Sequence, residues 1–243
     1  MNIGIFDSGI GGLNLLNKLI KTYNHNYFYY ADNKNIPYGN KTYKFIKRNV
    51  FYAMDYFLQN EVDVVIIACN TVSTMLGDLI KNIYPFEVVT ITPNFKNVIK
   101  YDKFVLLATD NTTNYILKNA NAIAKQCNLQ KAELLAKLQI VNTSELAYLT
   151  ETVAPNFYYN YRYIRDILKQ ISINIPILLG CTHYTYYQQY INSLGYKTYS
   201  EIEYFDKIGA ILQKNTNLCG TLTIKVTNFE KISTFYSIID KLL

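Results

Sequence analysis

The chain alternates short apolar runs with longer amphipathic segments along almost its whole length, and this pattern restricts the fold more than any other feature. Short apolar runs between polar turns are typical of buried strands, and amphipathic runs of ten or more residues are typical of helices. Repeated strand–helix alternation predicts mostly parallel sheets with helices on both faces, an α/β fold. The predicted strands are 2–6, 27–31, 62–68, 88–91, 104–108, 136–141, 175–179 and 221–227. The predicted helices are 12–21, 42–59, 71–83, 115–127, 162–170, 186–194, 203–214 and 229–243.

The composition argues against a secreted or membrane-spanning chain. The 243 residues are 50% hydrophobic, which is enough to bury a core in one large domain or in two smaller ones. The start of the chain reaches Asp7 without a basic segment, so no signal peptide is expected and a cytoplasmic location is predicted. The long uncharged stretch 171–196 contains Asn, Gln, Pro and His, which argues against a membrane helix.

Charge and cysteine content narrow the possible partners. The formal net charge is +6, but the lysines are scattered and the only arginines are Arg48, Arg162 and Arg165. Since arginine is the residue that nucleic-acid recognition most often uses, we interpret the charge as a solvated surface and expect no nucleic-acid partner. Four cysteines without a secretion signal predict a reducing compartment and free thiols.

The first strand ends in FDSGIGG, residues 6–12, which places Asp7 and Ser8 before a glycine-rich turn into a helix. Free N–H groups at such a helix start favour an anion. The spacing matches neither a Walker loop nor the dinucleotide-binding glycine pattern. The same turn would also serve simply to cap the helix.

Two further strand ends, ACNTVS at 68–73 and LLGCTHY at 178–184, each present a cysteine after a small residue. A helix start after a cysteine lowers the thiol pKa, although a single such cysteine is more often a small buried hydrophobe. Two in the same context, about half the chain apart, favour two similar halves that each offer one thiol. Cys127 and Cys219 lack this setting and are interpreted as structural.

Three chemistries can use opposed thiols. Zinc would take Cys69, Cys181 and His183, but no second pair has ligand spacing. A thiol hydrolase activated by His183 would leave one cysteine idle. Proton transfer at one carbon from both faces uses both cysteines equally. The hydrolase and a non-catalytic binding protein remain open alternatives.

Four segments together resemble glutamate racemases of the cofactor-independent aspartate/glutamate racemase superfamily. The segments are IGIFDSGIGGLNLL at 3–16, YYADNKNIPYGNKT at 29–42, ACNTVS at 68–73 and LLGCTHY at 178–184. Their order and spacing fit the family, and the closing strand and helix also look similar, so the resemblance spans nearly the whole chain. It implies interconversion of L- and D-glutamate without a cofactor or a metal, and a supply of D-glutamate for peptidoglycan.

The resemblance also implies a role for each matching residue. Cys69 would act on the α-proton of D-glutamate with Asp7 nearby, and Cys181 on that of L-glutamate with His183 nearby. The α-ammonium and α-carboxylate would be held by Ser8, Asn70, Thr71 and Thr182. The side-chain carboxylate would meet Pro37, Tyr38 and Gly39.

Two pseudo-symmetric lobes follow from the same resemblance, with the active site between them and a homodimer as the expected assembly. One lobe would comprise residues 1–94 and 206–243, and the other 95–205. The middle of the chain departs from the family: LATDNTTNY keeps Thr109 and Thr112 only, and neither Glu145 nor Glu151 is assigned to the family glutamate. A preference for another amino acid, such as aspartate, therefore stays an alternative.

Overall fold

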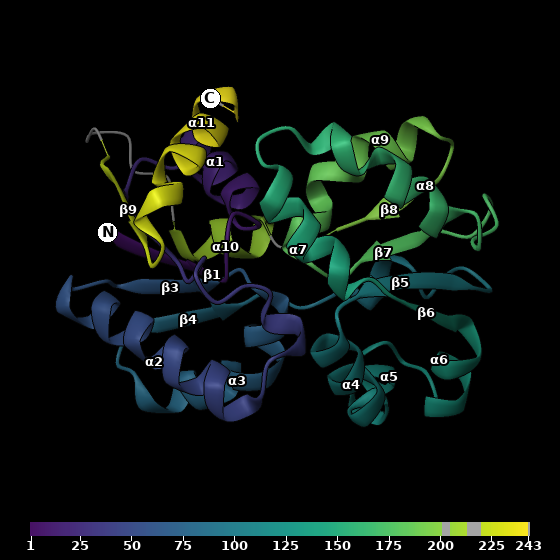
Figure 1. Ribbon diagram of the computed structural model, residues 1–243. Coiled ribbons are helices and arrows are strands. Elements are labelled where there is room, and N and C mark those ends of the chain that lie inside the picture. The colour runs from purple at the N-terminus through teal and green to yellow at the C-terminus, as the bar shows by residue number, and fades with distance from the viewer. Residues whose placement is uncertain (201–204, 213–219, 243) are drawn as a thin grey trace.

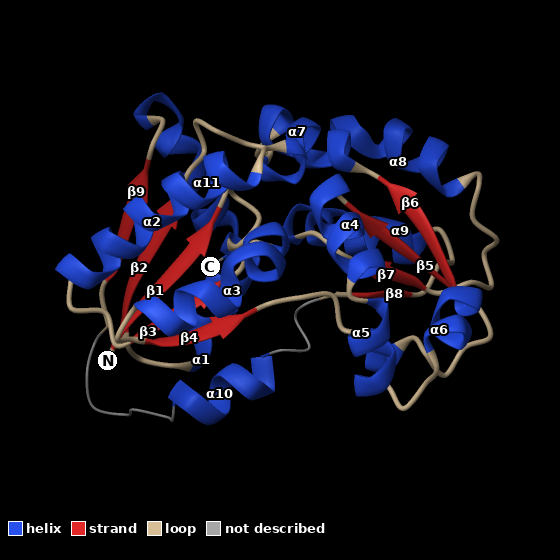
Figure 2. Cartoon of the chain, turned by 90° about the horizontal axis from the view of Figure 1, so that it is seen from below, coloured by secondary structure: helices blue, strands red, loops and turns tan. Residues whose placement is uncertain are grey.

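The fold consists of two parallel sheets, each covered by helices on both faces (Figures 1 and 2). The computed structural model describes residues 1–200, 205–212 and 220–242. The predicted α/β class with two lobes is confirmed. None of the helices in these ranges is long and apolar enough to cross a membrane.

The first sheet is built from both ends of the chain. Its strands lie in the order β4 (Glu87–Thr90), β3 (Val64–Ile67), β1 (Asn2–Asp7), β2 (Asn26–Ala31) and β9 (Leu222–Val226), all parallel. Successive side chains of a strand point to opposite faces. Ile3 and Ile5 therefore pack on one face, and Phe6 on the other. The first face is covered by α1 (Leu13–Thr22), α10 (Phe205–Leu212) and α11 (Ile232–Leu242), and the second by α2 (Tyr43–Gln59) and α3 (Asn70–Ile83).

The second sheet uses only the middle of the chain. Its strands lie in the order β6 (Leu138–Asn142), β5 (Phe104–Ala108), β7 (Ile177–Leu179) and β8 (Thr198–Tyr199), again all parallel. One face is covered by α7 (Ser144–Val153), α8 (Tyr161–Leu168) and α9 (Gln188–Ser193), and the other by α4 (Asp110–Lys118), α5 (Ala120–Gln126) and α6 (Lys131–Lys137). The lobe boundaries near residues 94 and 206 stay a prediction.

The sequence pattern misses several elements of the second lobe. The predicted helix 115–127 is two helices that meet at Asn119, and α6, α7 and the short β8 were not predicted. The buried face of α7 includes Thr150 and Glu151, which a hydrophobicity pattern counts as exposed positions. A helix whose buried side is partly polar therefore escapes detection by apolar periodicity.

Candidate active site

One small cavity lies where the carboxyl ends of the two sheets meet. Four of its lining residues follow the ends of strands: Ser8 and Thr109 come directly after β1 and β5, and Cys69 and Cys181 lie two residues after the ends of β3 and β7. Ligands of open parallel sheets bind at this edge. The complete lining is Ser8, Ile36, Pro37, Tyr38, Gly39, Cys69, Asn70, Thr71, Thr109, Ala147, Cys181, Thr182 and His183.

The cavity brings together every residue that the sequence assigned to the site except Asp7, which is fully buried beside it. The three lining residues that were not assigned are Ile36, Thr109 and Ala147. Cys127 is buried at the end of α5 and does not line the cavity, and Cys219 lies outside the described residues. The two cysteines that the motifs singled out thus share one site, whereas their chemical roles stay a prediction.

Cys69 is a protonated thiol in this arrangement. Its sulfur lies at the start of α3 and donates to Ser8 Oγ at 3.7 Å. Burial raises the pKa of Cys69 to about 12, and the nearby Asp7 carboxylate adds to the increase. A helix start was expected to lower this pKa. The loss of solvation around a fully buried thiolate outweighs the helix start here, so Cys69 needs a base to ionise it.

Cys181 lies in a different electrostatic setting. Its sulfur is 3.6 Å from His183 Nδ1, and His183 Nε2 is 2.8 Å from Glu151 Oε1. Burial lowers the pKa of His183, but its contacts with Cys181 and Glu151 outweigh that effect and hold the pKa well above the ordinary histidine value. The resulting imidazolium can stabilise a Cys181 thiolate or return a proton to it.

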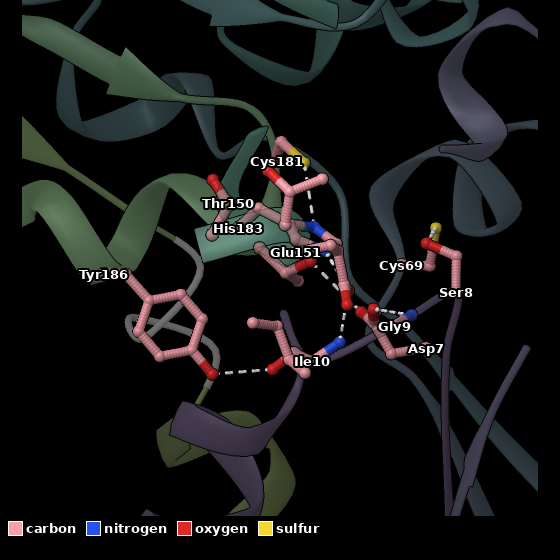
Figure 3. A network of polar contacts seen from close by, with 12 residues as sticks. Asp7, Ser8, Gly9, Ile10, Cys69, Thr150, Glu151, Cys181, His183 and Tyr186 are labelled. Carbon is pink, nitrogen blue, oxygen red and sulfur yellow. Dashed lines mark hydrogen bonds and ion pairs between the residues drawn. The ribbon is translucent and has the colours of Figure 1, made fainter. Parts of the chain in front are cut away.

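Glu151 also joins the two lobes (Figure 3). Its Oε1 accepts a hydrogen bond from the backbone N–H of Ile10 at 2.6 Å as well as contacting His183. A Cβ atom at Gly9 would clash with this carboxylate, so the turn after β1 approaches Glu151 as closely as only glycine allows. Tyr186 Oη donates to the Ile10 carbonyl at 2.7 Å. The glycine turn is thereby fixed against the second lobe through both the N–H and the carbonyl of Ile10.

Sequence reasoning did not assign Glu151, because the family's preceding cysteine–proline pair is missing from this chain. The structure separates the two candidate glutamates clearly. Glu151 is 4% exposed and contacts His183, whereas Glu145 is exposed and accepts a hydrogen bond from Tyr163. A spacing of six residues puts two side chains on different faces of a helix, so only one of them could face the site. The spacing of Glu145 and Glu151 is informative only once the segment is known to be a helix, and α7 was not predicted.

Asp7 is placed to exchange protons with its neighbours. Its two oxygens accept hydrogen bonds from Gly9 N at 2.9 Å and from Thr182 Oγ1 at 3.1 Å. Burial raises the pKa of Asp7 to about 6, although the charge of His183 opposes the increase. Near neutral pH the carboxylate is therefore mostly ionised, and it can serve as the base that Cys69 needs.

The raised pKa of Asp7 predicts a pH dependence of stability. A carboxyl whose folded pKa exceeds its unfolded value stabilises the fold below the unfolded pKa, and this contribution is lost as the pH rises through the folded pKa. Between about pH 4 and pH 7, the free energy of unfolding of the wild type relative to Asp7→Asn is expected to fall by roughly 3 kcal/mol. Urea unfolding of both proteins across this range measures the difference. A constant difference would contradict the raised pKa.

Asn70, Thr71 and Thr109 supply further polar groups at the cavity. Asn70 Nδ2 donates to the Ile91 carbonyl at 3.2 Å, and its Oδ1 is buried without a partner in the described part of the chain. The hydroxyl of Thr71 lies 3.3 Å from that of Thr109 and 3.5 Å from that of Thr112. The Asn70 Oδ1 acceptor and the Thr71 hydroxyl can therefore form hydrogen bonds with a polar ligand.

The cavity must enlarge before it can hold an amino acid. Its volume is about 10 Å³, which is room for about one water molecule. Ligand entry therefore requires lining side chains or the lobes to move apart. With regard to a metal, no group of three or more His, Cys, Asp and Glu side chains in residues 1–200, 205–212 and 220–242 is arranged to hold an ion.

Comparison with known proteins identifies the family. No protein-family model matches the chain. Glutamate racemases of two Buchnera aphidicola strains are similar in sequence. The one from the Acyrthosiphon pisum strain 5A is 30% identical and covers 86% of this chain and 80% of its own length. The one from the Schizaphis graminum strain is 32% identical and covers 86% of this chain and 83% of its own length. The fold is similar to that of Escherichia coli glutamate racemase solved with L-glutamate and the activator UDP-MurNAc-ala, with a TM-score of 0.79 and 21% identity over 99% of this chain and 94% of that one. The two thiols share one cavity, and the sequence is at least 30% identical to these relatives over most of its length. This chain therefore belongs to the glutamate racemase family.

Proposed function

We propose that the protein interconverts L- and D-glutamate without a cofactor, by proton transfer between the substrate α-carbon and two cysteines. The observation that carries this proposal is the placement of Cys69 and Cys181 in one cavity, one from each lobe. Inverting an α-carbon requires a proton to leave one face and another to arrive on the opposite face. Two thiols from opposite lobes suit that requirement.

The proton balance of each direction follows from this arrangement. Toward L-glutamate, the Cys69 thiolate removes the α-proton of D-glutamate and becomes a thiol, while the Cys181 thiol gives its proton to the other face and becomes a thiolate. Before this step Asp7 accepts the proton that the Cys69 thiol loses, and after it His183 returns a proton to the Cys181 thiolate. In the reverse direction Cys181 removes the proton and Cys69 supplies it.

The polar groups around the cavity support the binding of an amino acid. Asn70 Oδ1, which has no partner among the described residues, is a suitable acceptor for the α-ammonium, and the hydroxyls of Ser8 and Thr71 are suitable donors for the α-carboxylate. The Thr182 hydroxyl, which donates to Asp7, can join them once it turns toward the ligand. The 37–39 segment lines the remaining side of the cavity and is assigned to the side-chain carboxylate. A buried, preorganised site is also what the carbanion-like transition state requires.

The biological setting completes the proposal. Racemases of this family supply D-glutamate for peptidoglycan in the cytoplasm and are often dimers. We assign the same role and a homodimeric assembly to this protein.

The test is a proton NMR time course of the purified protein with L-glutamate in D2O and no added cofactor, followed by chiral analysis. We expect the α-proton signal to disappear and D-glutamate to accumulate toward an equal mixture. The same experiment with aspartate tests the substrate preference. A protein that exchanges no α-proton of either amino acid would refute the proposed activity.

A further inference from the structure

We propose that Asn111 is a positioning residue that holds the substrate side-chain end of the cavity in place across the lobe interface. This inference rests on the proposed function, since it deepens the assignment of the 37–39 segment to the side-chain carboxylate. Asn111 lies in the part of the chain that departs from the family motif, and no matching motif assigns it a role.

The loop 37–41 is fixed to its own lobe mainly through one side chain. Tyr38 is 1% exposed, its ring lies 6.3 Å from that of Phe6, and its hydroxyl donates to Asp32. Asp32 is buried as well and also accepts hydrogen bonds from Thr227 at 2.8 Å and from Asn35 at 2.9 Å. These contacts anchor the Tyr38 side chain but leave the main chain of the loop to be held from elsewhere.

That second support comes from the other lobe. Asn111, in the first turn of α4, donates from Nδ2 to the Tyr38 carbonyl and to the Lys41 carbonyl, both at 2.9 Å. A side-chain amide nitrogen carries two hydrogens, so one group satisfies both carbonyls. The Lys41 N–H also donates to the Tyr38 carbonyl at 3.1 Å and closes the turn between them. Asn111 is thus hydrogen-bonded to both ends of the turn.

The turn is pressed against the second lobe at its centre. A Cβ atom at Gly39 would clash with the side chain of Thr109, which is the residue before α4 and lines the cavity. Gly39 therefore allows the close approach that lets the Asn111 amide reach both carbonyls. The loop, Thr109 and Asn111 form one continuous contact between the lobes along this side of the cavity.

Asn111 stands apart from the proton-transfer groups. Within the described part of the chain, the side-chain hydrogen bonds of Asn111 go to the loop, whereas Cys69 contacts Ser8 and Cys181 contacts His183. Loss of Asn111 should therefore weaken the binding of ground state and transition state alike. Such a loss raises KM and leaves kcat nearly unchanged.

The test is steady-state racemisation of glutamate by Asn111→Ala. Losing two neutral hydrogen bonds is expected to raise KM about tenfold, with kcat within about twofold of the wild type. Asn111→Asp keeps the side-chain size but has no donor for the carbonyls, so KM should rise at least as much. The matched control is Asn114→Ala, which removes the same side chain from the exposed face of the same helix and should leave KM unchanged.

The outcomes separate this inference from the proposed function. An active wild type together with an unchanged KM in Asn111→Ala would overturn the positioning role, and so would a loss confined to kcat. A lower melting temperature with wild-type kinetics would show a structural contact only and would overturn it too. A wild type that racemises nothing would refute the proposed function itself, and with it the substrate end assigned to Asn111.

Discussion

Replacing either cavity cysteine by serine, Cys69→Ser or Cys181→Ser, is expected to reduce glutamate racemisation by about three orders of magnitude or more. Serine has nearly the same size, so both variants should fold, but its hydroxyl is far less acidic than a thiol. In the proposed mechanism each face of the α-carbon needs its own proton-transfer group, so the remaining cysteine is not expected to replace the lost one.

The values of kcat/KM for the two directions of the reaction must decrease by the same factor. L- and D-glutamate have equal free energy in achiral water, so a variant that loses kcat/KM in one direction loses it equally in the other. Chiral analysis started from each enantiomer measures both values. This equality holds for any variant, and it checks the assay itself before the losses are compared.

A third cysteine variant supplies the control. Cys127→Ser changes a buried thiol that does not line the cavity, and near wild-type racemisation is expected. Near-normal turnover of Cys69→Ser or Cys181→Ser would rule out the two-thiol mechanism. If only one of the two mattered and a covalent adduct formed on it, the protein would be a thiol hydrolase instead.

Glu151→Gln is expected to lower kcat by about a hundredfold, whereas Glu145→Gln on the same helix should stay within about twofold of the wild type. The glutamine can still accept from Ile10 N–H, but it no longer carries the charge that favours the imidazolium of His183. The pKa of His183 should then fall, so the protonated histidine that serves Cys181 is lost at neutral pH.

The pH profile tells this electrostatic role from a purely structural one. In Glu151→Gln, the activity that depends on protonated His183 should be recovered in part by lowering the pH, whereas Glu145→Gln should keep the profile of the wild type. Equal losses in both variants would show that the whole α7 helix has been disturbed. An unchanged rate in Glu151→Gln would remove Glu151 from the proton-transfer network.

Much of the first lobe was predictable because its elements follow simple rules. In β1, β2 and β3 the residues between the two ends are apolar or aromatic, and α1, α2 and α3 each bury an apolar stripe. Most of the cavity was predictable as well, since the motifs lie at the carboxyl ends of parallel strands and those ends meet at one edge. Strands that are buried on both faces of a parallel sheet consist mostly of apolar residues, and such runs can be recognised in the sequence.

The second lobe was less predictable because part of its interior is polar. The buried side chains of α7 include Thr150, which bonds to the Tyr187 hydroxyl at 3.0 Å, and Glu151. Each is satisfied by a partner distant in the chain, and a buried polar group is stable only with such a partner. Local periodicity carries no information about a partner more than 30 residues away.

The fold class, the two thiols and the family can be inferred from the sequence alone, because strand periodicity and the residues at strand ends are local properties of the chain. The electrostatics of the site and the contacts between the lobes depend on the folded structure. Burial, and not the helix start, sets the pKa of Cys69, and packing across the interface selects Glu151 and brings Asn111 to the 37–41 loop. These effects depend on distances between residues far apart in sequence, which exist only once both lobes have folded against each other.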